Sequence, residues 1–305
     1  MHPQFALGLD LGGTQLKAGL VDRAGTVGRF LSIPSRAAEG AGGPIEAIAE
    51  ATSALLRDHD VAAIALGTPG MVDALAGVVT DRTPHLPHWT DFALGAALRA
   101  RLGREVAIEN DANLAALAEH RAGAARGARV SITVTVGTGI GSGIVIEGRV
   151  MRGFGGGAGE IGHLPLGSGE FACRCGVANC VEPEASGSGL VRQARALDLD
   201  VNDASGVFAA AAAGEPNARA LIARLADRLG AVIGVAVNTL NPDVVVVGGG
   251  VADAGEALFA PLRAALERYT LASHRRGLRL LPAMLGNRAG VVGAGLLAWE
   301  NVAQS

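Results

Sequence analysis

All three cysteines of this 305-residue chain lie within eight residues, in the stretch "CRCGVANC" at 173–180. His163 stands ten residues before the first of them, which makes a set of one imidazole and three thiols. Such a set suits tetrahedral Zn²⁺ with no open position, and therefore a structural metal rather than a hydrolytic one. A redox pair and a chance cluster in a tight loop are the alternatives. The stretch has no Cys-x-x-Cys, and a bridge across Cys-x-Cys would be strained. The spacing therefore predicts zinc bound by His163, Cys173, Cys175 and Cys180.

An Asn-Asp pair, Asn110 and Asp111, stands where an expected strand ends and an expected helix begins. One interpretation is a helix cap, because an Asn or Asp side chain there accepts hydrogen bonds from the free backbone N–H groups. The other is catalytic. A carboxylate at this place can take the proton from a substrate hydroxyl as that hydroxyl attacks a phosphoryl group. Taken alone, the pair does not decide between the two.

Two glutamates flank the cysteine stretch and its histidine. Glu160 precedes His163 in "GEIGH", and Glu182 follows the last cysteine in "CVE". Together with the Asn-Asp pair they could form hydrogen bonds with a polyhydroxylated ligand, or they could be ordinary solvated loop charges. The chain has one Tyr and two Trp, so ligand specificity is expected to be mostly polar.

Two glycine-rich turns have related sequences at a constant offset of 124 residues. Residues 13–19 and 137–143 both read G-T-x-[Leu/Ile]-x-x-G between strand-like runs. Such turns can direct backbone N–H groups and hydroxyls at phosphate oxygens, although an ordinary structural turn explains either one alone. Asp10 is placed to hold Mg²⁺ through water, and Lys17 could add positive charge. "GGG" at 248–250 is a third candidate for a phosphate or ribose contact.

The elements that would position these residues also occur twice. Apolar runs predict strands at 5–11, 15–22, 61–70 and 105–111, and then at 129–136, 243–251 and 278–283. Helices are expected at 44–59, 112–124, 187–197, 216–240, 255–269 and 289–301. The pattern of strands and helices begins again after about residue 117. Together with the repeated turn, this predicts two similar domains that face a cleft.

Composition restricts the classes of partner. The net charge is -3, which gives no electrostatic footprint for nucleic acid or an anionic membrane. The first residues lack the features of a signal peptide, and no apolar run is long enough to span a bilayer. An odd number of clustered cysteines argues against a secreted disulfide framework. We therefore expect a cytoplasmic protein without a nucleic-acid or membrane partner.

The motifs together resemble the ROK family (repressors, open reading frames and sugar kinases), bacterial glucokinase-like proteins of the actin and hexokinase superfamily. "LGLDLGGTQLKAGLVD" resembles the first phosphate motif of the family, "VTVGTGIGSGIV" the second and "VVVVGGGV" the adenosine motif. "ENDAN" resembles the segment with the catalytic aspartate. "GEIGH…CRCGVANCVE" resembles the family signature E-x-G-H…C-x-C-G-x(4)-C-x-E. The resemblance covers nearly the whole chain.

The resemblance implies an α/β fold of two actin-like (ribonuclease H-like) domains around a central cleft. Residues 1–117 and the C-terminal helix 288–305 would form the smaller domain, and residues 118–287 the larger domain with the zinc loop. A homodimer is also implied, since family members often form one.

The resemblance also implies which residues bind each ligand. ATP would contact Asp10, Gly12, Gly13, Thr14, Lys17, Gly137, Thr138, Gly139, Gly249 and Gly250. The sugar would contact Gly70, Asn110, Asp111, Glu160, His163 and Glu182, with Asp111 as the general base. His163 would then serve both zinc and sugar, one ring nitrogen for each. Mg²⁺ would accompany ATP.

The implied activity is ATP-dependent phosphorylation of a hexose at its 6-hydroxyl, most simply a glucokinase reaction of glycolysis. Fructose, mannose, N-acetylmannosamine and N-acetylglucosamine are alternative acceptors. A non-enzymatic sugar sensor is a further alternative, whereas the negative charge and the short segment before the first motif disfavour a DNA-binding repressor.

Two departures from the family pattern bear on these expectations. Asn179 replaces a glycine before the last cysteine, and Asn tolerates a left-handed backbone better than most residues. His85 and His88, in "TPHLPHW", replace an amide and a glycine of the usual glucokinase pattern. The second departure concerns the identity of the sugar and not the chemistry.

Overall fold

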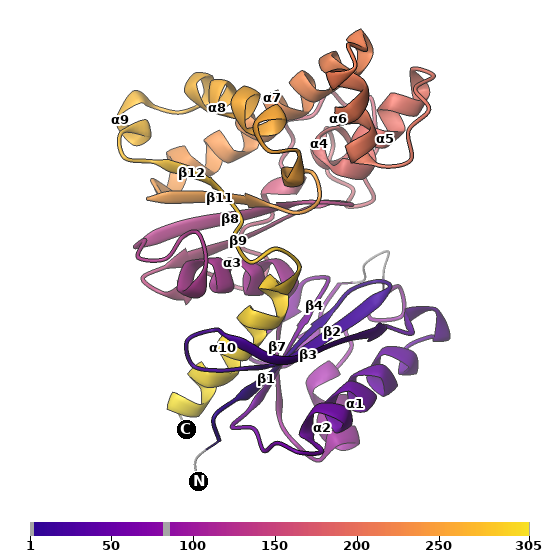
Figure 1. Ribbon diagram of the computed structural model, residues 1–305, viewed down its shortest axis with the longest axis vertical. Helices are drawn as coiled ribbons and strands as arrows, with labels where there is room; N and C mark the ends of the chain where they lie inside the picture. The colour runs from indigo at the N-terminus through magenta and orange to yellow at the C-terminus, as the bar shows by residue number, and fades with distance from the viewer. Residues whose placement is uncertain (1–2, 82–85, 305) are drawn as a thin grey trace. The chain divides into compact units, whose positions relative to one another are not determined.

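The computed structural model of the chain describes residues 3–81 and 86–304 (Figure 1). The chain folds into two compact units. The first comprises Met1–Gly127, Gly148–Ala158 and Asn287–Ser305, and the second comprises Ala128–Glu147 and Gly159–Gly286. The junction expected near residue 117 lies inside a helix that the structure keeps whole in the first unit, because this helix packs chiefly on the C-terminal helix of the same unit.

The first unit is built on a five-stranded sheet. Its strands are β1 (Ala6–Leu11), β2 (Gln15–Val21), β3 (Val27–Pro34), β4 (Ile64–Thr68) and β7 (Val106–Asn110), in the order β3-β2-β1-β4-β7. β1 pairs antiparallel with β2 and parallel with β4, and β4 pairs parallel with β7. The carboxyl ends of β1, β4 and β7 therefore meet at one edge of the sheet. Asp10 and Asn110 lie in the last residues of β1 and β7, and Gly70 follows β4.

Helices cover both faces of this sheet. They are α1 (Gly42–Leu56), α2 (Leu94–Leu102), α3 (Asp111–Ala122) and α10 (Ala289–Gln304), with short turns of 3-10 helix at Ala37–Glu39 and Gly286–Arg288. Leu7 and Leu9 of β1 share a core with Ile48 of α1, whereas Gly8, between them, faces α10. A Cβ on Gly8 would lie 2.1 Å from the carbonyl oxygen of Val291, so only glycine lets α10 approach this closely. Figure 1 shows α10, in yellow, lying along the sheet of the first unit.

The second unit repeats this sheet. Its strands are β8 (Val130–Val136), β9 (Ile140–Ile146), β11 (Val244–Gly248) and β12 (Arg279–Pro282), in the order β9-β8-β11-β12. The short strand β10 (Arg149–Val150), which pairs with β9, lies in the segment Gly148–Ala158 that is counted with the first unit. β8 pairs antiparallel with β9 and parallel with β11, as β1 does with β2 and β4. All of β11 is buried, as its continuous β-branched run predicted. The expected duplication within an α/β fold is confirmed by this topology.

The other elements of the second unit are mostly helical. They are α4 (Glu182–Ala185), α5 (Gly187–Ala196), α6 (Ala204–Ala212), α7 (Pro216–Leu240), α8 (Glu256–Tyr269) and α9 (Ala272–Arg275), with 3-10 turns at Ile161–His163 and Ala252–Ala254. The first unit also has a small hairpin of β5 (Val72–Asp73) and β6 (Val78–Val79). Across residues 3–81 and 86–304, no helix combines the length and apolar character needed to cross a membrane.

Candidate functional site

The first glycine-rich turn joins β1 to β2 and is closed by its own backbone. The N–H of Gly12 donates to the carbonyl of Gln15 at 2.8 Å. Ser35, just after β3, donates its N–H to the carbonyl of Thr14 at 3.0 Å and its hydroxyl to that of Gly13 at 2.9 Å. Neighbours on the same three-stranded edge of the sheet therefore hold the turn.

Asp10 and Lys17 form a cross-strand pair beside this turn. They are direct partners in the β1–β2 register, and Lys17 Nζ lies 3.7 Å from Asp10 Oδ2. The Asp10 side chain is 18% exposed. Burial raises the pKa of Asp10 above its ordinary value, and Lys17 partly offsets this rise. Gly290 of α10 lies against the carboxylate, since a Cβ there would be 2.4 Å from Asp10 Cγ. The carboxylate is thus held between a lysine and the first turn of a helix.

Asn110 and Asp111 lie at the carboxyl end of β7. Asn110 is the N-cap of α3, and its Oδ1 accepts the N–H of Asn113 at 3.0 Å, so the capping interpretation is confirmed for Asn110. Its Nδ2 also donates to the carbonyl of Gly70 at 3.0 Å, which ties the strand end to the loop after β4. Asp111 is the first residue of α3, partly exposed, with Oδ1 accepting the N–H of Ala112 at 2.8 Å. The partial positive charge of a helix N-terminus favours a negatively charged side chain at this position.

Glu109, which the sequence analysis did not single out, supports this segment from within the core. It is 0% exposed. Its Oε1 accepts the N–H of Asn110 and the Nδ2 of Asn113, each at 3.0 Å. Its Oε2 accepts Arg152 Nε at 2.6 Å. A glutamate inside the otherwise apolar run "VAIEN" was the available signal, because a buried charge requires a partner.

The second glycine-rich turn joins β8 to β9 and depends on more distant neighbours. The N–H of Gly137 donates to Gly139 O at 2.9 Å, and the N–H of Gly187, at the start of α5, donates to Gly137 O at 2.8 Å. Glu182 Oε2 accepts the N–H of Ile140 at 3.0 Å. A Cβ on Gly139 would lie 2.6 Å from that oxygen, so the glycine makes room for the carboxylate.

The GGG run after β11 lies beside this second turn. Gly249 has a φ of +84°, and a Cβ on it would lie 2.5 Å from the carbonyl oxygen of Val136, the last residue of β8. The N–H of Val251 donates to the same carbonyl at 3.1 Å. Gly250 faces open space. The second unit therefore brings together two of the three predicted nucleotide segments.

The predicted zinc ligands also lie together. One ligand atom from each of His163, Cys173, Cys175 and Cys180 can be chosen so that all lie within 4.8 Å of one another. His163 Nδ1 is 3.4 Å from Cys180 Sγ and 3.9 Å from Cys173 Sγ. The N–H of Val177 donates to Cys175 Sγ at 3.4 Å, the kind of bond that orients a metal-binding thiolate. This donor set fits a tetrahedral Zn²⁺.

The loop backbone accommodates the asparagine that departs from the family pattern. Asn179 has a φ of +55°, in the left-handed region, as its side chain allows. Its carbonyl accepts the N–H of Gly167 at 2.7 Å, so the two sides of the loop are bonded together. Burial raises the pKa of the Cys180 thiol, and a bound cation would oppose this by favouring the thiolate.

His163 contacts the cluster and a predicted sugar residue with different ring atoms. Nδ1 faces the cysteines, and Nε2 lies 3.9 Å from Glu160 Oε2. Burial raises the pKa of Glu160; the nearby His163 opposes this rise, and Glu182 adds to it. The geometry therefore leaves Nε2 directed away from the metal set, as a dual role would require.

A buried glutamate also anchors the cysteine loop, and the sequence analysis missed it. Glu184 of α4 is 2% exposed and accepts Arg228 Nε at 3.1 Å and the Ser168 hydroxyl at 2.7 Å. Arg228 Nη1 donates to Leu166 O at 3.1 Å. The adjacent pattern "EPE" gave no means of separating this structural glutamate from Glu182.

The predicted site residues fall into one group in each unit. The first unit contains Asp10, Gly12, Gly13, Thr14, Lys17, Gly70, Asn110 and Asp111, and the second contains Gly137, Thr138, Gly139, Glu160, His163, Glu182, Gly249, Gly250 and the three cysteines. His85 lies outside the described residues, and His88 is exposed.

Comparison with known proteins gives a consistent set of matches. The sequence model of the ROK family matches residues 6–301. The chain is 36% identical to a glucokinase of Halalkalibacterium halodurans, over 97% of this chain and 96% of that protein. The structure of a ROK hexokinase from Thermus thermophilus matches with a TM-score of 0.85 and 39% identity, over 98% of this chain and 99% of that one. A ROK family glucokinase from Streptomyces griseus, solved with glucose and AMPPNP, matches with a TM-score of 0.83 and 34% identity, over 97% and 99%.

Proposed function

The chain belongs to the ROK family, and on that premise we propose that it is an ATP-dependent hexose kinase that phosphorylates glucose at the 6-hydroxyl. The observation that carries the proposal is the full-length likeness to a glucokinase solved with glucose and AMPPNP, in a chain that has Asp111 at the head of α3. The acceptor hydroxyl must lose a proton during the reaction, and a carboxylate at this position can accept it.

Asp111 is the proposed general base. Its carboxylate takes the proton of the sugar hydroxyl while the hydroxyl oxygen forms a bond to the γ-phosphorus and the bond from that phosphorus to the β,γ-bridging oxygen breaks. The products are the sugar phosphate, ADP and a protonated Asp111. Asn110 positions the base, because it caps α3 with one side-chain atom and holds the Gly70 loop with the other.

The nucleotide is proposed to contact both glycine-rich turns. Phosphate oxygens would accept hydrogen bonds from backbone N–H groups and hydroxyls of these turns, with Lys17 adding charge. Magnesium bound with ATP would offset the negative charge of the phosphates, and Asp10, anchored beside Lys17, would hold it through water. Gly249 and Gly250 would contact the adenosine.

Glu160, His163 and Glu182 are the proposed sugar residues of the second unit. Each carries a polar atom outside the thiol cluster, with His163 Nε2 near Glu160 and Glu182 bonded to Ile140. Zinc at His163 and the three cysteines would fix the loop that carries them, and its role there is structural. Cytoplasmic location and a homodimer complete the proposal. The location rests on the composition of the chain and the homodimer on the family resemblance, and sedimentation velocity tests the homodimer.

The test is a coupled ADP-release assay on the purified chain. Glucose, mannose, fructose, N-acetylmannosamine and N-acetylglucosamine would be compared, each with ATP and with polyphosphate as donor. We expect the highest kcat/KM for glucose with ATP. A higher value for another sugar would replace glucose, whereas calorimetric sugar binding without ADP release would identify a sensor and refute the kinase.

A further inference from the structure

The ion pair between Glu109 and Arg152 lies next to the proposed base in the chain. Glu109 Oε2 accepts Arg152 Nε at 2.6 Å, and the Glu109 side chain is 1% exposed. Glu109 is a residue of β7 itself, paired with Gly67 of β4 and two residues before Asp111. Replacement of a buried ion pair with well-packed apolar side chains is often neutral or stabilising. Stability alone therefore does not account for a charged pair at this position.

The other oxygen of Glu109 binds the two asparagines that begin α3. Oε1 accepts the backbone N–H of Asn110 and the Nδ2 of Asn113, each at 3.0 Å. The N–H of Asn113 donates to Asn110 Oδ1 at 3.0 Å, so the three residues form a closed ring of hydrogen bonds. Asp111 lies within this ring in the sequence, because it joins Asn110 to the first turn of α3. The orientation of the Asp111 backbone therefore depends on the Glu109 carboxylate.

Arg152 connects this carboxylate to a glycine-rich loop. The N–H of Ala158 donates to the carbonyl of Arg152 at 3.0 Å, which closes the loop "GFGGG" at 153–157. Gly156 has a φ of +82°, and a Cβ on it would collide with the carbonyl oxygen of Val72. Only glycine lets the two backbones approach this closely. The loop that begins at Arg152 is therefore packed directly on β5.

These contacts return to Asn110 from a different side. Its Nδ2 donates to the carbonyl of Gly70 at 3.0 Å, and Gly70 stands two residues before Val72, which the glycine-rich loop contacts. The end of β7 is thus bonded both to the loop after β4 and, through Glu109 and Arg152, to the glycine-rich loop. All of these residues belong to the first unit. The ion pair is one link in a closed circuit of contacts that holds Asn110.

We propose that Glu109 and Arg152 are positioning residues, which hold Asn110 and Asp111 in the arrangement that sugar binding and proton transfer require. This inference rests on the proposed kinase function. A displacement of about 1 Å in a reacting group can cost about 100-fold in rate, so a support of this kind affects turnover as well as folding. In the described part of the chain, no hydrogen bond joins either residue to the first glycine-rich turn, so nucleotide binding should not depend on the pair.

The test compares variants of the full chain by ADP release, and by calorimetry with glucose and AMPPNP as separate probes. R152Q leaves the Glu109 carboxylate without its cation. We expect kcat to fall about 10- to 100-fold and the Kd for glucose to rise at least about 5-fold. The KM for ATP should stay within about 3-fold of the wild-type value. Because a single nitrogen of Arg152 makes the bond, R152K keeps a cationic donor and should recover most of the loss.

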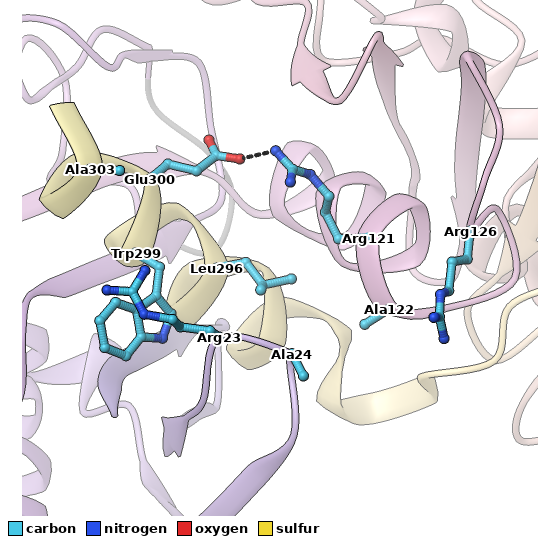
Figure 2. Close-up of a pocket in the computed structure, with 9 residues that line it drawn as sticks. All are labelled: Arg23, Ala24, Arg121, Ala122, Arg126, Leu296, Trp299, Glu300 and Ala303. Carbon is cyan, nitrogen blue, oxygen red and sulfur yellow. Dashed lines mark hydrogen bonds and ion pairs between the residues drawn. The ribbon is translucent and has the colours of Figure 1, made fainter. Parts of the chain in front are cut away.

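R121Q is the matched control. Arg121 forms an ion pair of the same length, 2.6 Å, with Glu300, and Figure 2 shows this bond as a dashed line between α3 and α10. Arg121 lies ten residues after Asp111, about 15 Å along the same helix. Because distant sites act independently, we expect R121Q to lower the Tm but to keep kcat and the Kd for glucose within about 2-fold of wild type. A purely structural role of Arg152 would give the same result for R152Q.

A second variant removes both charges, so that no carboxylate is left buried without a partner if R152Q does not fold. In E109M/R152M the asparagines lose their acceptor, and we expect a folded chain by circular dichroism with kcat reduced at least about 10-fold. Wild-type kcat and glucose Kd in either folded variant, or equal losses in R121Q and R152Q, would overturn the proposal. The wild-type chain tests the kinase separately. If it binds glucose without ADP release, the kinase is refuted, and the Kd for glucose of the variants still tests the pair.

Discussion

The two glycine-rich turns occupy the same place in equivalent sheets, yet different parts of the chain hold them. The first is closed between Gly12 and Gln15 and tied to Ser35 at the end of the neighbouring strand. The second is bonded to Gly187 of α5 and to Glu182, which follows the cysteine cluster. One turn is supported locally, and the other is supported by the loop that the metal would hold.

The strand registers of the two hairpins differ as well. The last pair of the first hairpin is Leu11 with Leu16, which leaves residues 12–15 between these two paired residues. The last pair of the second is Val136 with Ile140, which leaves residues 137–139. The shorter second connection places the N–H of Ile140 toward Glu182. Two turns with the same sequence pattern can therefore be held by different hydrogen-bond partners. In the second unit, Glu182 connects the proposed sugar residues to a proposed phosphate turn.

The largest effect is expected from a variant that removes the proposed base and leaves both glycine-rich turns unchanged. Asp111→Asn removes the proposed base and keeps the shape of the side chain. We expect kcat to fall about 10²- to 10⁴-fold, the usual contribution of a general base. Neither turn is altered, so the KM for ATP should change less than about 3-fold, because uniform binding is retained. Steady-state ADP release measures both quantities, and near-normal turnover in a folded variant would remove Asp111 from the mechanism.

Removal of the metal is expected to have the next largest effect. Chelation should free the cysteine loop, raise the KM for sugar about 10- to 100-fold and, through Glu182, raise the KM for ATP as well. Arg174, exposed between two cysteines, should become a site of rapid trypsin cleavage. Both tryptophans, Trp89 and Trp299, lie in the first unit, so their emission should not change. Elemental analysis of the purified chain gives the starting metal content, expected to be near one zinc per chain.

Two outcomes would contradict this account. Less than about 0.1 zinc per chain in carefully purified protein would remove the metal, since a structural site binds zinc tightly. A chelated chain that loses sugar affinity but keeps its affinity for ATP would show that the second turn does not depend on the loop. The second result would make the two turns alike in their support.

A smaller effect is expected when the hydrogen bond from Ile140 to Glu182 is removed. Glu182→Ala leaves the N–H of Ile140 without its partner and removes a proposed sugar contact. Each lost hydrogen bond to a charged group is worth about 1.5–3 kcal/mol, so we expect both KM values to rise about 10-fold or more. The matched control is Glu160→Ala, which lacks a bond to the turn and should raise the KM for sugar alone. If Glu182→Ala and Glu160→Ala changed the KM for ATP equally, the bond from Ile140 to Glu182 would not support the second turn.

Spacing and motif were sufficient to predict the repeated strand–turn–strand pattern and the clustering of His163 with the three cysteines, because each depends on residues close together in sequence. The supports were not predictable in the same way. Glu109 finds Arg152 across 43 positions, and Glu184 finds Arg228 across 44, so local patterns carry no signal for either pair. The family signature predicted that Glu182 binds the sugar, whereas its bond to Ile140 depends on the folded loop and is seen only in the structure. The residues that perform the proposed chemistry were visible in the sequence, and those that hold them were visible mainly in the structure.

The smallest expected effect tests the independence of the first turn. Ser35→Ala removes the hydroxyl bond to Gly13 O and leaves the backbone bond from Ser35 N to Thr14 O. One neutral hydrogen bond contributes about 1 kcal/mol, so the KM for ATP should rise no more than about 5-fold. The KM for sugar should not change, because no bond leads from this turn to a proposed sugar residue in the described part of the chain. Ser188→Ala is the matched control, since its hydroxyl donates to Thr138 O of the second turn in the same way. A rise in the KM for sugar with Ser35→Ala, as large as with Glu182→Ala, would show that the first turn is coupled to the sugar residues after all and would end the distinction between the two turns.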